Sequence, residues 1–189
     1  MKVLLGLGNP GPEYTDTRHN VGWWLLDACH ERWGGGPWKR DGEALAADHR
    51  LGDVRVRLVK PLTYMNLSGR VLGQYLRRPL WKASDDLLVL VDEVALPLAT
   101  MRIRPKGSPG GHNGLKDVQR MVGSGDYARL RIGIRPEDER RLGGDLADFV
   151  LGKFGKDEAA FVREAMPRMV EAVECWVKEG VIEAMNRFN

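Results

Sequence analysis

The polar segment at residues 8–20 holds the first side chains of this chain that could act on a bound substrate. It follows the apolar run Val3–Leu5, which is too short for an amphipathic helix and predicts a buried strand. The imidazole of His19 can take a proton from water, and the amide of Asn9 can hold a polar ligand. Catalytic groups often lie on polar loops that follow the end of a rigid strand. We therefore predict a reactive site in this loop.

A dinucleotide site is the first alternative, because Gly6, Gly8 and Gly11 satisfy the pattern G-x-G-x-x-G. That pattern requires a helix that begins at the glycines and an acidic residue after the next strand, about 20 residues further on. Here two prolines bracket Gly11, and the acid at that distance, Asp27, lies inside the predicted helix at residues 21–33. We therefore reject nucleotide binding.

A second predicted strand ends at a carboxylate. Residues 87–91 are apolar on both faces, as in a central parallel strand, and Asp92 follows them. Open α/β sheets bind ligands beyond the carboxyl ends of their strands. If the first strand is a parallel neighbour of this one, Asp92 could reach His19, orient it and stabilise its protonated form. The alternative is that Asp92 caps a helix and that His19 is an ordinary loop residue.

Asn66 and Asn113 each lie on a glycine-flanked turn before a predicted helix. An amide side chain can hold a carbonyl group or a water molecule and can stabilise an oxyanion without adding charge. The alternative role is helix capping, which we favour for Asn20. The chain has no G-x-S-x-G motif, and its four histidines show no paired metal spacing. Water activated by His19, without metal or cofactor, is therefore the predicted chemistry.

Arginine alternates with apolar residues at positions 100–104 and 129–135, so each predicted strand would present a row of arginines on one face. Such a row can bind phosphate or simply face solvent, and the pattern alone favours solvent. Arg55 and Arg57 show the same alternation. The net charge of +3 is too small to indicate a nucleic-acid partner by itself.

Helical and strand patterns alternate along the chain, which indicates the α/β class, and 189 residues suit a single domain at residues 1–189. Further strands are predicted at residues 44–49 and 54–60, which form a hairpin, and further helices at residues 68–77, 115–122 and over the last quarter of the chain. The segment at residues 136–144 is predicted to be an exposed connection.

The chain shows no signal segment and no membrane-spanning run. Its two cysteines, Cys29 and Cys175, lie in helical patterns far apart in sequence, as buried thiols of a reducing compartment do. These features predict a cytoplasmic protein.

Four segments, in the order GLGNPGPEYTDTRHNVG, KPLTYMNLSG, VLVDE and KGSPGGHNGLKD, resemble bacterial peptidyl-tRNA hydrolases. With the later RLRIGI and FVLGKF segments they cover nearly the whole chain. The resemblance implies a cytoplasmic, monomeric, single-domain α/β protein with a twisted, mixed, largely parallel sheet between helices. It also implies cleavage of the ester that joins a peptide to the terminal ribose of a transfer RNA.

Position within these segments implies the role of each residue. His19 would be the catalytic base and Asp92 its partner. An RNA-binding module that has lost the chemistry is the competing hypothesis, and the presence of both residues argues against it. The other implied residues are Asn9, Tyr14, Asn66 and Asn113 for substrate binding, and Arg104 and Arg131 for the terminal phosphate of the transfer RNA.

Two positions after Asp92 depart from the family pattern. Ala95 stands where an acidic or amide residue is typical, and Ala99 stands where glycine is typical. Neither is a proposed catalytic group, so the departures concern the geometry of the turn after the strand.

Overall fold

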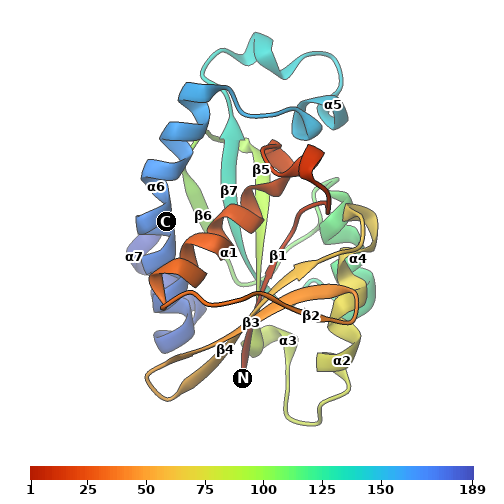
Figure 1. The fold of residues 1–189 in the computed structure, drawn as a ribbon, viewed down its shortest axis with the longest axis vertical. Helices are drawn as coiled ribbons and strands as arrows, with labels where there is room; N and C mark the ends of the chain where they lie inside the picture. Colours follow the sequence, from red (N-terminus) through yellow and green to blue (C-terminus); the bar gives the residue numbers. More distant parts are fainter.

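The computed structural model describes residues 1–189 and contains one seven-stranded sheet with the order β2-β3-β4-β1-β5-β7-β6 (Figure 1). The three central pairs, β4–β1, β1–β5 and β5–β7, are parallel, and the pairs toward both edges are antiparallel. The strands are β1 (Lys2–Gly6), β2 (Lys39–Asp41), β3 (Ala44–Leu51), β4 (Val54–Pro61), β5 (Leu87–Pro97), β6 (Met101–Arg104) and β7 (Ala128–Arg135).

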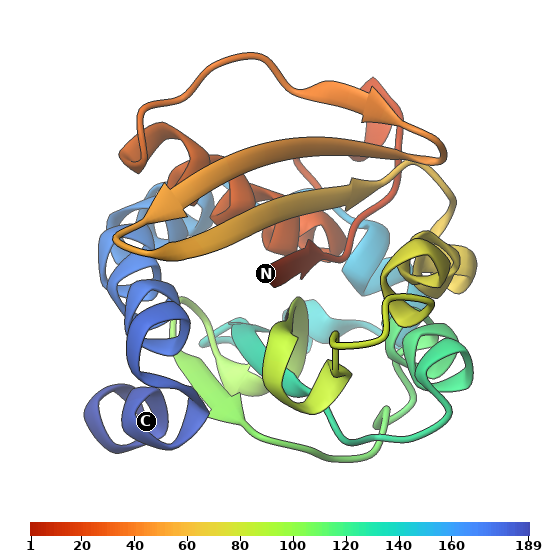
Figure 2. The same cartoon turned by 90° about the horizontal axis from the view of Figure 1, so that it is seen from below.

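Helices cover both faces of this sheet. Figure 2 shows α1 and α6 on one side of the molecule and α2 and α4 on the other. None of the helices combines the length and the apolar character needed to cross a bilayer. The helices are α1 (Val21–Arg32), α2 (Gly73–Leu76), α3 (Ala83–Asp86), α4 (Asn113–Val122), α5 (Leu146–Leu151), α6 (Lys156–Glu179) and α7 (Val181–Phe188), with 3₁₀ segments η1 (Pro12–Tyr14), η2 (Arg18–Asn20), η3 (Met65–Leu72) and η4 (Glu139–Leu142).

The central strands are apolar on both faces because each face packs on helices. Successive side chains of a strand point to opposite faces. In β5, Leu88 and Leu90 pack in the core with α1 and α6, whereas Leu87 and Val89 pack in the second core with α4. The predicted α/β class, the mixed and largely parallel sheet, and the helices on both faces are confirmed.

Three elements differ from the sequence-based expectation. The helix predicted at residues 68–77 is a 3₁₀ segment, interrupted by the non-helical backbone of Leu67, followed by the four-residue α2. Gly69 in this segment packs directly on the backbone of Asp117 in α4. Strand β5 continues to Pro97 and pairs with β7 beyond its predicted end. The short edge strand β2 was not predicted, since three polar residues carry no apolar alternation.

Ala99 has a backbone φ of 64°, the only positive φ among the non-glycine residues. The family pattern has glycine at this position. In a residue with a side chain, the left-handed conformation places Cβ too close to the following carbonyl oxygen. We expect Ala99→Gly to raise the free energy of unfolding by about 0.5 to 1 kcal/mol in denaturant titration, after the greater entropy of glycine in the unfolded chain is subtracted.

The matched control is Ala95→Gly, which lies within β5 and has no positive φ. Glycine in a strand costs about 0.5–1 kcal/mol relative to alanine, so this variant should lose stability. Equal destabilisation of both variants would show that Ala99 is not strained.

Candidate active site

A cleft of about 480 Å³ opens beyond the carboxyl end of β1, beside residues 92–94 in the middle of β5. It is lined by five of the predicted site residues and contains no lysine or arginine. A larger groove of about 610 Å³ lies between α1 and α6, but it holds neither histidine nor asparagine. The chemistry therefore points to the smaller cleft. The five residues are Asn9, His19, Asn66, Asp92 and Asn113.

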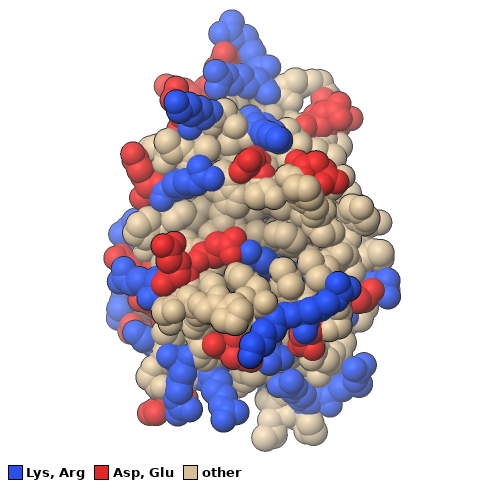
Figure 3. All heavy atoms as spheres, in the orientation of Figure 1, with Lys and Arg blue, Asp and Glu red and all other residues tan.

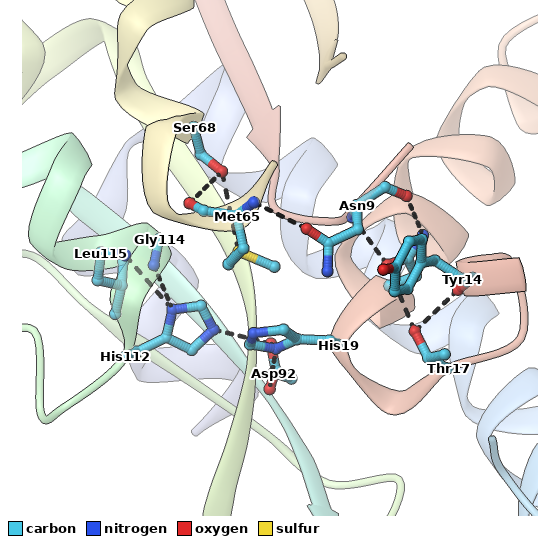
Figure 4. Close-up of polar contacts among 11 residues, drawn as sticks. Asn9, Tyr14, Thr17, His19, Met65, Ser68, Asp92, His112, Gly114 and Leu115 are labelled. Carbon is cyan, nitrogen blue, oxygen red and sulfur yellow. Dashed lines mark hydrogen bonds and ion pairs between the residues drawn. The ribbon is translucent and has the colours of Figure 1, made fainter. Parts of the chain in front are cut away.

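His19 and Asp92 meet at the base of this cleft (Figure 4). His19 Nδ1 lies 2.9 Å from each carboxylate oxygen of Asp92, and both residues are buried. The parallel pairing of β1 with β5 places the loop that follows β1 beside Asp92. The predicted contact is therefore present. Asp92 lies within β5 and does not cap a helix.

A second histidine joins the pair. His112 Nε2 lies 2.9 Å from Asp92 Oδ1, and His112 Nδ1 accepts hydrogen bonds from the backbone N–H groups of Gly114 and Leu115 at the start of α4. Because Nδ1 accepts, the proton of a neutral His112 must be on Nε2, which donates to Asp92. His112 is not among the site residues that the sequence predicts; the only local signal for it is its place next to Asn113.

Asp92 is held as a carboxylate. Burial opposes its charge, but electrostatic attraction and hydrogen bonds from His19 and His112 prevail and keep the pKa of Asp92 well below its usual range. A carboxylate can only accept hydrogen bonds, so His19 must donate through Nδ1. This tautomer leaves the Nε2 lone pair of His19 available as a base.

Asn9 is fixed by its neighbours (Figure 4). Asn20 accepts a hydrogen bond from the Asn9 N–H and donates one to the Asn9 carbonyl, at 2.9 and 3.0 Å. The side-chain oxygen of Asn9 accepts from the backbone N–H of Met65 at 2.7 Å, which leaves its Nδ2 without a protein acceptor. Asn20 does occupy the N-cap position of α1, but its side chain makes no capping hydrogen bond and positions Asn9 instead.

Asn66 and Asn113 are exposed in the wall of the cleft. The capping alternative fails for both. His112 caps α4, and no side chain caps η3. Neither amide forms a hydrogen bond within the protein, so both can bind a ligand. Tyr14, in contrast, is not part of the cleft lining. Its ring stands edge-on to that of Tyr64, which does line the cleft, at 6.4 Å between centroids.

The trio His19, Asp92 and His112 is the one cluster whose ligand atoms approach closely enough to hold a metal ion, within 4.8 Å of one another. The tautomer of His112 opposes that role. Metal binding at Nε2 would move the imidazole proton to Nδ1, where it would face two backbone N–H donors. The hydrogen bonds at this cluster therefore favour proton transfer over metal binding.

Residues 3–189 match the family model described as peptidyl-tRNA hydrolase. The chain belongs to this family. It is 56% identical to the peptidyl-tRNA hydrolase of Gemmatimonas aurantiaca, with 98% of each chain covered, and 49% identical to that of Symbiobacterium thermophilum, with 100% of this chain and 98% of the relative covered. The crystal structure of the peptidyl-tRNA hydrolase from Acinetobacter baumannii superposes with a TM-score of 0.87 at 31% identity, covering 100% of this chain and 94% of that chain.

The two arginines implied by the resemblance to peptidyl-tRNA hydrolases lie outside the cleft lining. In the β6–β7 pairing Arg102 is opposite Arg131 and Arg104 is opposite Arg129, so all four share one face of the sheet. Arg104 is exposed and forms no hydrogen bond, whereas Arg131 donates to Glu93 at 2.8 Å. Glu93 lines the cleft and so connects it to the arginine strands.

Arg129 differs from its neighbours because its side chain is completely buried. It donates to the carbonyl groups of Ser108 and Gly125 and stacks on the ring of Tyr127 at 4.3 Å. Arg129 therefore holds together the loops beside β7 and is not available to a ligand.

Proposed function

We propose that this protein hydrolyses the ester bond of peptidyl-tRNA with a water molecule activated by His19. Membership of the peptidyl-tRNA hydrolase family supports the substrate and the bond. The observation that supports the mechanism is the hydrogen bond from His19 Nδ1 to the buried carboxylate of Asp92, which leaves Nε2 as the base.

In the proposed reaction His19 Nε2 takes a proton from water as the water oxygen attacks the ester carbonyl carbon. Asp92 stabilises the resulting imidazolium without taking its proton. The tetrahedral intermediate then expels the ribose oxygen, which receives that proton from His19. The products are a peptide with a free carboxylate and an intact transfer RNA. The Nδ2 groups of Asn9, Asn66 and Asn113 can donate to the peptide, to the reacting water or to the carbonyl oxygen as its negative charge develops.

We further propose that the protein catalyses this reaction in the cytoplasm and as a monomer. Both cysteines are unpaired and buried, and burial raises the pKa of the Cys29 thiol, as suits an unreactive thiol in a reducing compartment. The alternative of a non-catalytic RNA-binding module has no observation in its favour, since His19 and Asp92 are present and in contact.

The deciding assay is release of peptide from an N-acylated aminoacyl-tRNA, with the unacylated form as control. Release from the acylated form supports the proposal. Binding of the RNA without release of peptide would favour the RNA-binding alternative.

Asn66→Ala and Asn113→Ala should each lower kcat/KM. Loss of one donor to the developing oxyanion costs about 2.7–4 kcal/mol in the transition state, and loss of a plain substrate contact costs less. A fall in kcat would assign the first role, and a rise in KM alone would assign the second. Asn186→Ala, an exposed asparagine on α7, is the matched control and should change neither constant. Unchanged kinetics with a lower melting temperature would give Asn66 and Asn113 a purely structural role.

We further propose that Arg104 and Arg131 bind the terminal phosphate of the transfer RNA. Positive and negative side chains are interspersed over the face shown in Figure 3, in line with the net charge of only +3. A local pair of arginines, more than overall charge, would therefore have to position the RNA. The ion pair with Glu93 would orient Arg131, so that its guanidinium lies between the cleft and the bound phosphate.

Arg104→Ala should raise KM on full-length substrate and leave kcat nearly unchanged, because the guanidinium is not part of the cleft lining. The slope of log affinity against log salt should flatten by about 0.7–0.9 for each lost phosphate contact. A short ester substrate without that phosphate should not distinguish the variant from the wild type.

Arg55→Ala is the matched control, since Arg55 is exposed on β4 and has no acidic partner. Arg57 is unsuitable, because it is paired with Asp48 and Asp41 and its loss would disturb the sheet edge. Equal increases in KM from Arg55→Ala and Arg104→Ala would replace the proposed clamp by diffuse positive charge.

A further inference from the structure

We infer that Arg18 is a positioning residue that holds helix α5 as the apolar wall of the peptide-binding side of the cleft. The inference deepens the proposed function and rests on it. It starts from the side chain next to the proposed base, which the mechanism does not use.

The guanidinium of Arg18 is enclosed, with only 11% of the side chain exposed. Its Nη1 donates to the backbone carbonyl of Phe149 in α5 at 3.2 Å, and its Nη2 donates to Glu158 Oε2 in α6 at 3.1 Å. The guanidinium also stacks on the ring of Phe149 at 4.2 Å. At Gly152, just after α5, a Cβ atom would lie 2.9 Å from Arg18 Nη1. The chain is thus shaped around this guanidinium.

Glu158 connects Arg18 to both ends of the segment that contains α5. Its Oε2 also accepts from the backbone N–H of Gly155 at 2.8 Å, at the start of α6. Its Oε1 accepts from Arg141 in η4 at 3.4 Å. Arg141 is largely exposed, so Arg18 is the buried partner of this carboxylate. Removal of one partner from a buried ion pair is costly, because it leaves the other charge buried without compensation.

The backbone reinforces the same connection. Arg18 N–H donates to the Gly152 carbonyl at 3.0 Å, and Phe154 N–H donates to the Asp16 carbonyl at 3.1 Å. Between them, Thr17 and Lys153 form an isolated antiparallel bridge. The residue that precedes His19 is therefore attached directly to the end of α5.

Helix α5 supplies one side of the cleft. Leu146, Ala147, Val150 and Leu151 all line it, and Leu146 and Leu151 are 54% and 44% exposed. Figure 1 shows α5 above the red segments that follow β1, apart from the long helix α6, and α5 contacts η2. A helix of six residues is not stable by itself, so its place depends on tertiary contacts such as those of Arg18.

This arrangement predicts which part of the substrate depends on Arg18. The exposed leucines of α5 offer apolar surface to a peptide side chain near the ester, whereas the proposed mechanism places the ester itself beside His19 and the asparagine amides. Loss of Arg18 should therefore weaken the binding of peptides with apolar residues and leave the chemical step nearly intact.

The test compares two substrates on the same transfer RNA: N-acetylglycyl-tRNA, which offers no side chain to α5, and N-acetyl-dileucyl-tRNA. Arg18→Met keeps the length of the stem and removes the charge and the donors. We expect it to raise KM for the dileucyl substrate about tenfold, and to change KM for the glycyl substrate and both kcat values by less than about twofold. Arg18→Lys, which keeps the charge, should restore part of the difference.

The matched control is Arg163→Met. Arg163 lies on α6 and stacks over Trp24 at 4.5 Å in the groove between α1 and α6, so its loss should alter neither substrate. If Arg18→Met does not fold, Glu158→Gln provides the second variant, because it keeps an acceptor for Gly155 N–H and should show the same selectivity in weaker form.

Equal effects on both substrates, or a fall in kcat for both, would overturn the inference and assign Arg18 to the general stability of the site. Unchanged constants for both substrates would also overturn it. Failure of the proposed function is distinguishable, because the wild-type protein would then release neither glycyl nor dileucyl peptide.

Discussion

His19→Ala should lose most of its turnover on an N-acylated aminoacyl-tRNA, with kcat lower by about 10²- to 10⁴-fold. The variant keeps the cleft and the three asparagine amides but has no group that can take the proton from the attacking water. Substrate binding should change much less than kcat, since the imidazole acts mainly as the reaction proceeds. The measurement is single-turnover peptide release together with the affinity for the substrate.

His49→Ala is the matched control for removal of a histidine. His49 lies on β3 and pairs with His30 at 2.7 Å, outside the cleft. Its loss should affect stability and leave kcat near the wild-type value. Wild-type kcat in His19→Ala would refute the assignment of His19 as general base.

Asp92→Asn should also be severe, with a fall in kcat that approaches the roughly 10⁴-fold effect of a wrong histidine tautomer. The Nε2–H group of His112 would hold the amide oxygen at the Oδ1 position, which puts the amide NH₂ group at the Oδ2 position, 2.9 Å from His19 Nδ1. His112 cannot adapt, because its Nδ1 already accepts from α4. His19 would then accept through Nδ1 and carry its proton on Nε2, where the base is needed.

Asp117→Asn is the matched control, since Asp117 is also a buried aspartate but holds Gly69 N–H and Arg120 outside the cleft. We expect it to lower the melting temperature without a comparable loss of kcat. If Asp92→Asn retained wild-type kcat across the pH range, His19 would not depend on Asp92 for its tautomer.

Residues close in sequence produced the most reliable predictions. The apolar residues at 87–91 predict a strand buried on both faces, and β5 packs on helices from both sides. The polar residues after two such strands predict a shared site, because parallel strands end at the same edge of a sheet. The contact between His19 and Asp92, which lie 73 positions apart, follows from this single topological rule.

Local sequence patterns could not predict features that depend on how the loops pack on one another. Asn20 lies at the N-cap position of α1, as its sequence context predicts, but the turn around η1 and η2 brings its side chain to Asn9 and not to the helix. The left-handed φ of Ala99 likewise appears only once β5 and β6 are joined.

The α/β class, the central strands and the residue types of the candidate site can be predicted from the sequence, because burial along a strand and polarity after it depend on neighbouring residues. Three features are seen only in the folded protein: His112 shares the carboxylate of Asp92, the hydrogen bonds of this cluster fix the tautomers of both histidines, and Arg18 contacts α5. Those facts depend on atoms brought together from distant segments, and hydrogen-bond direction is defined only when all partners of an atom are in place.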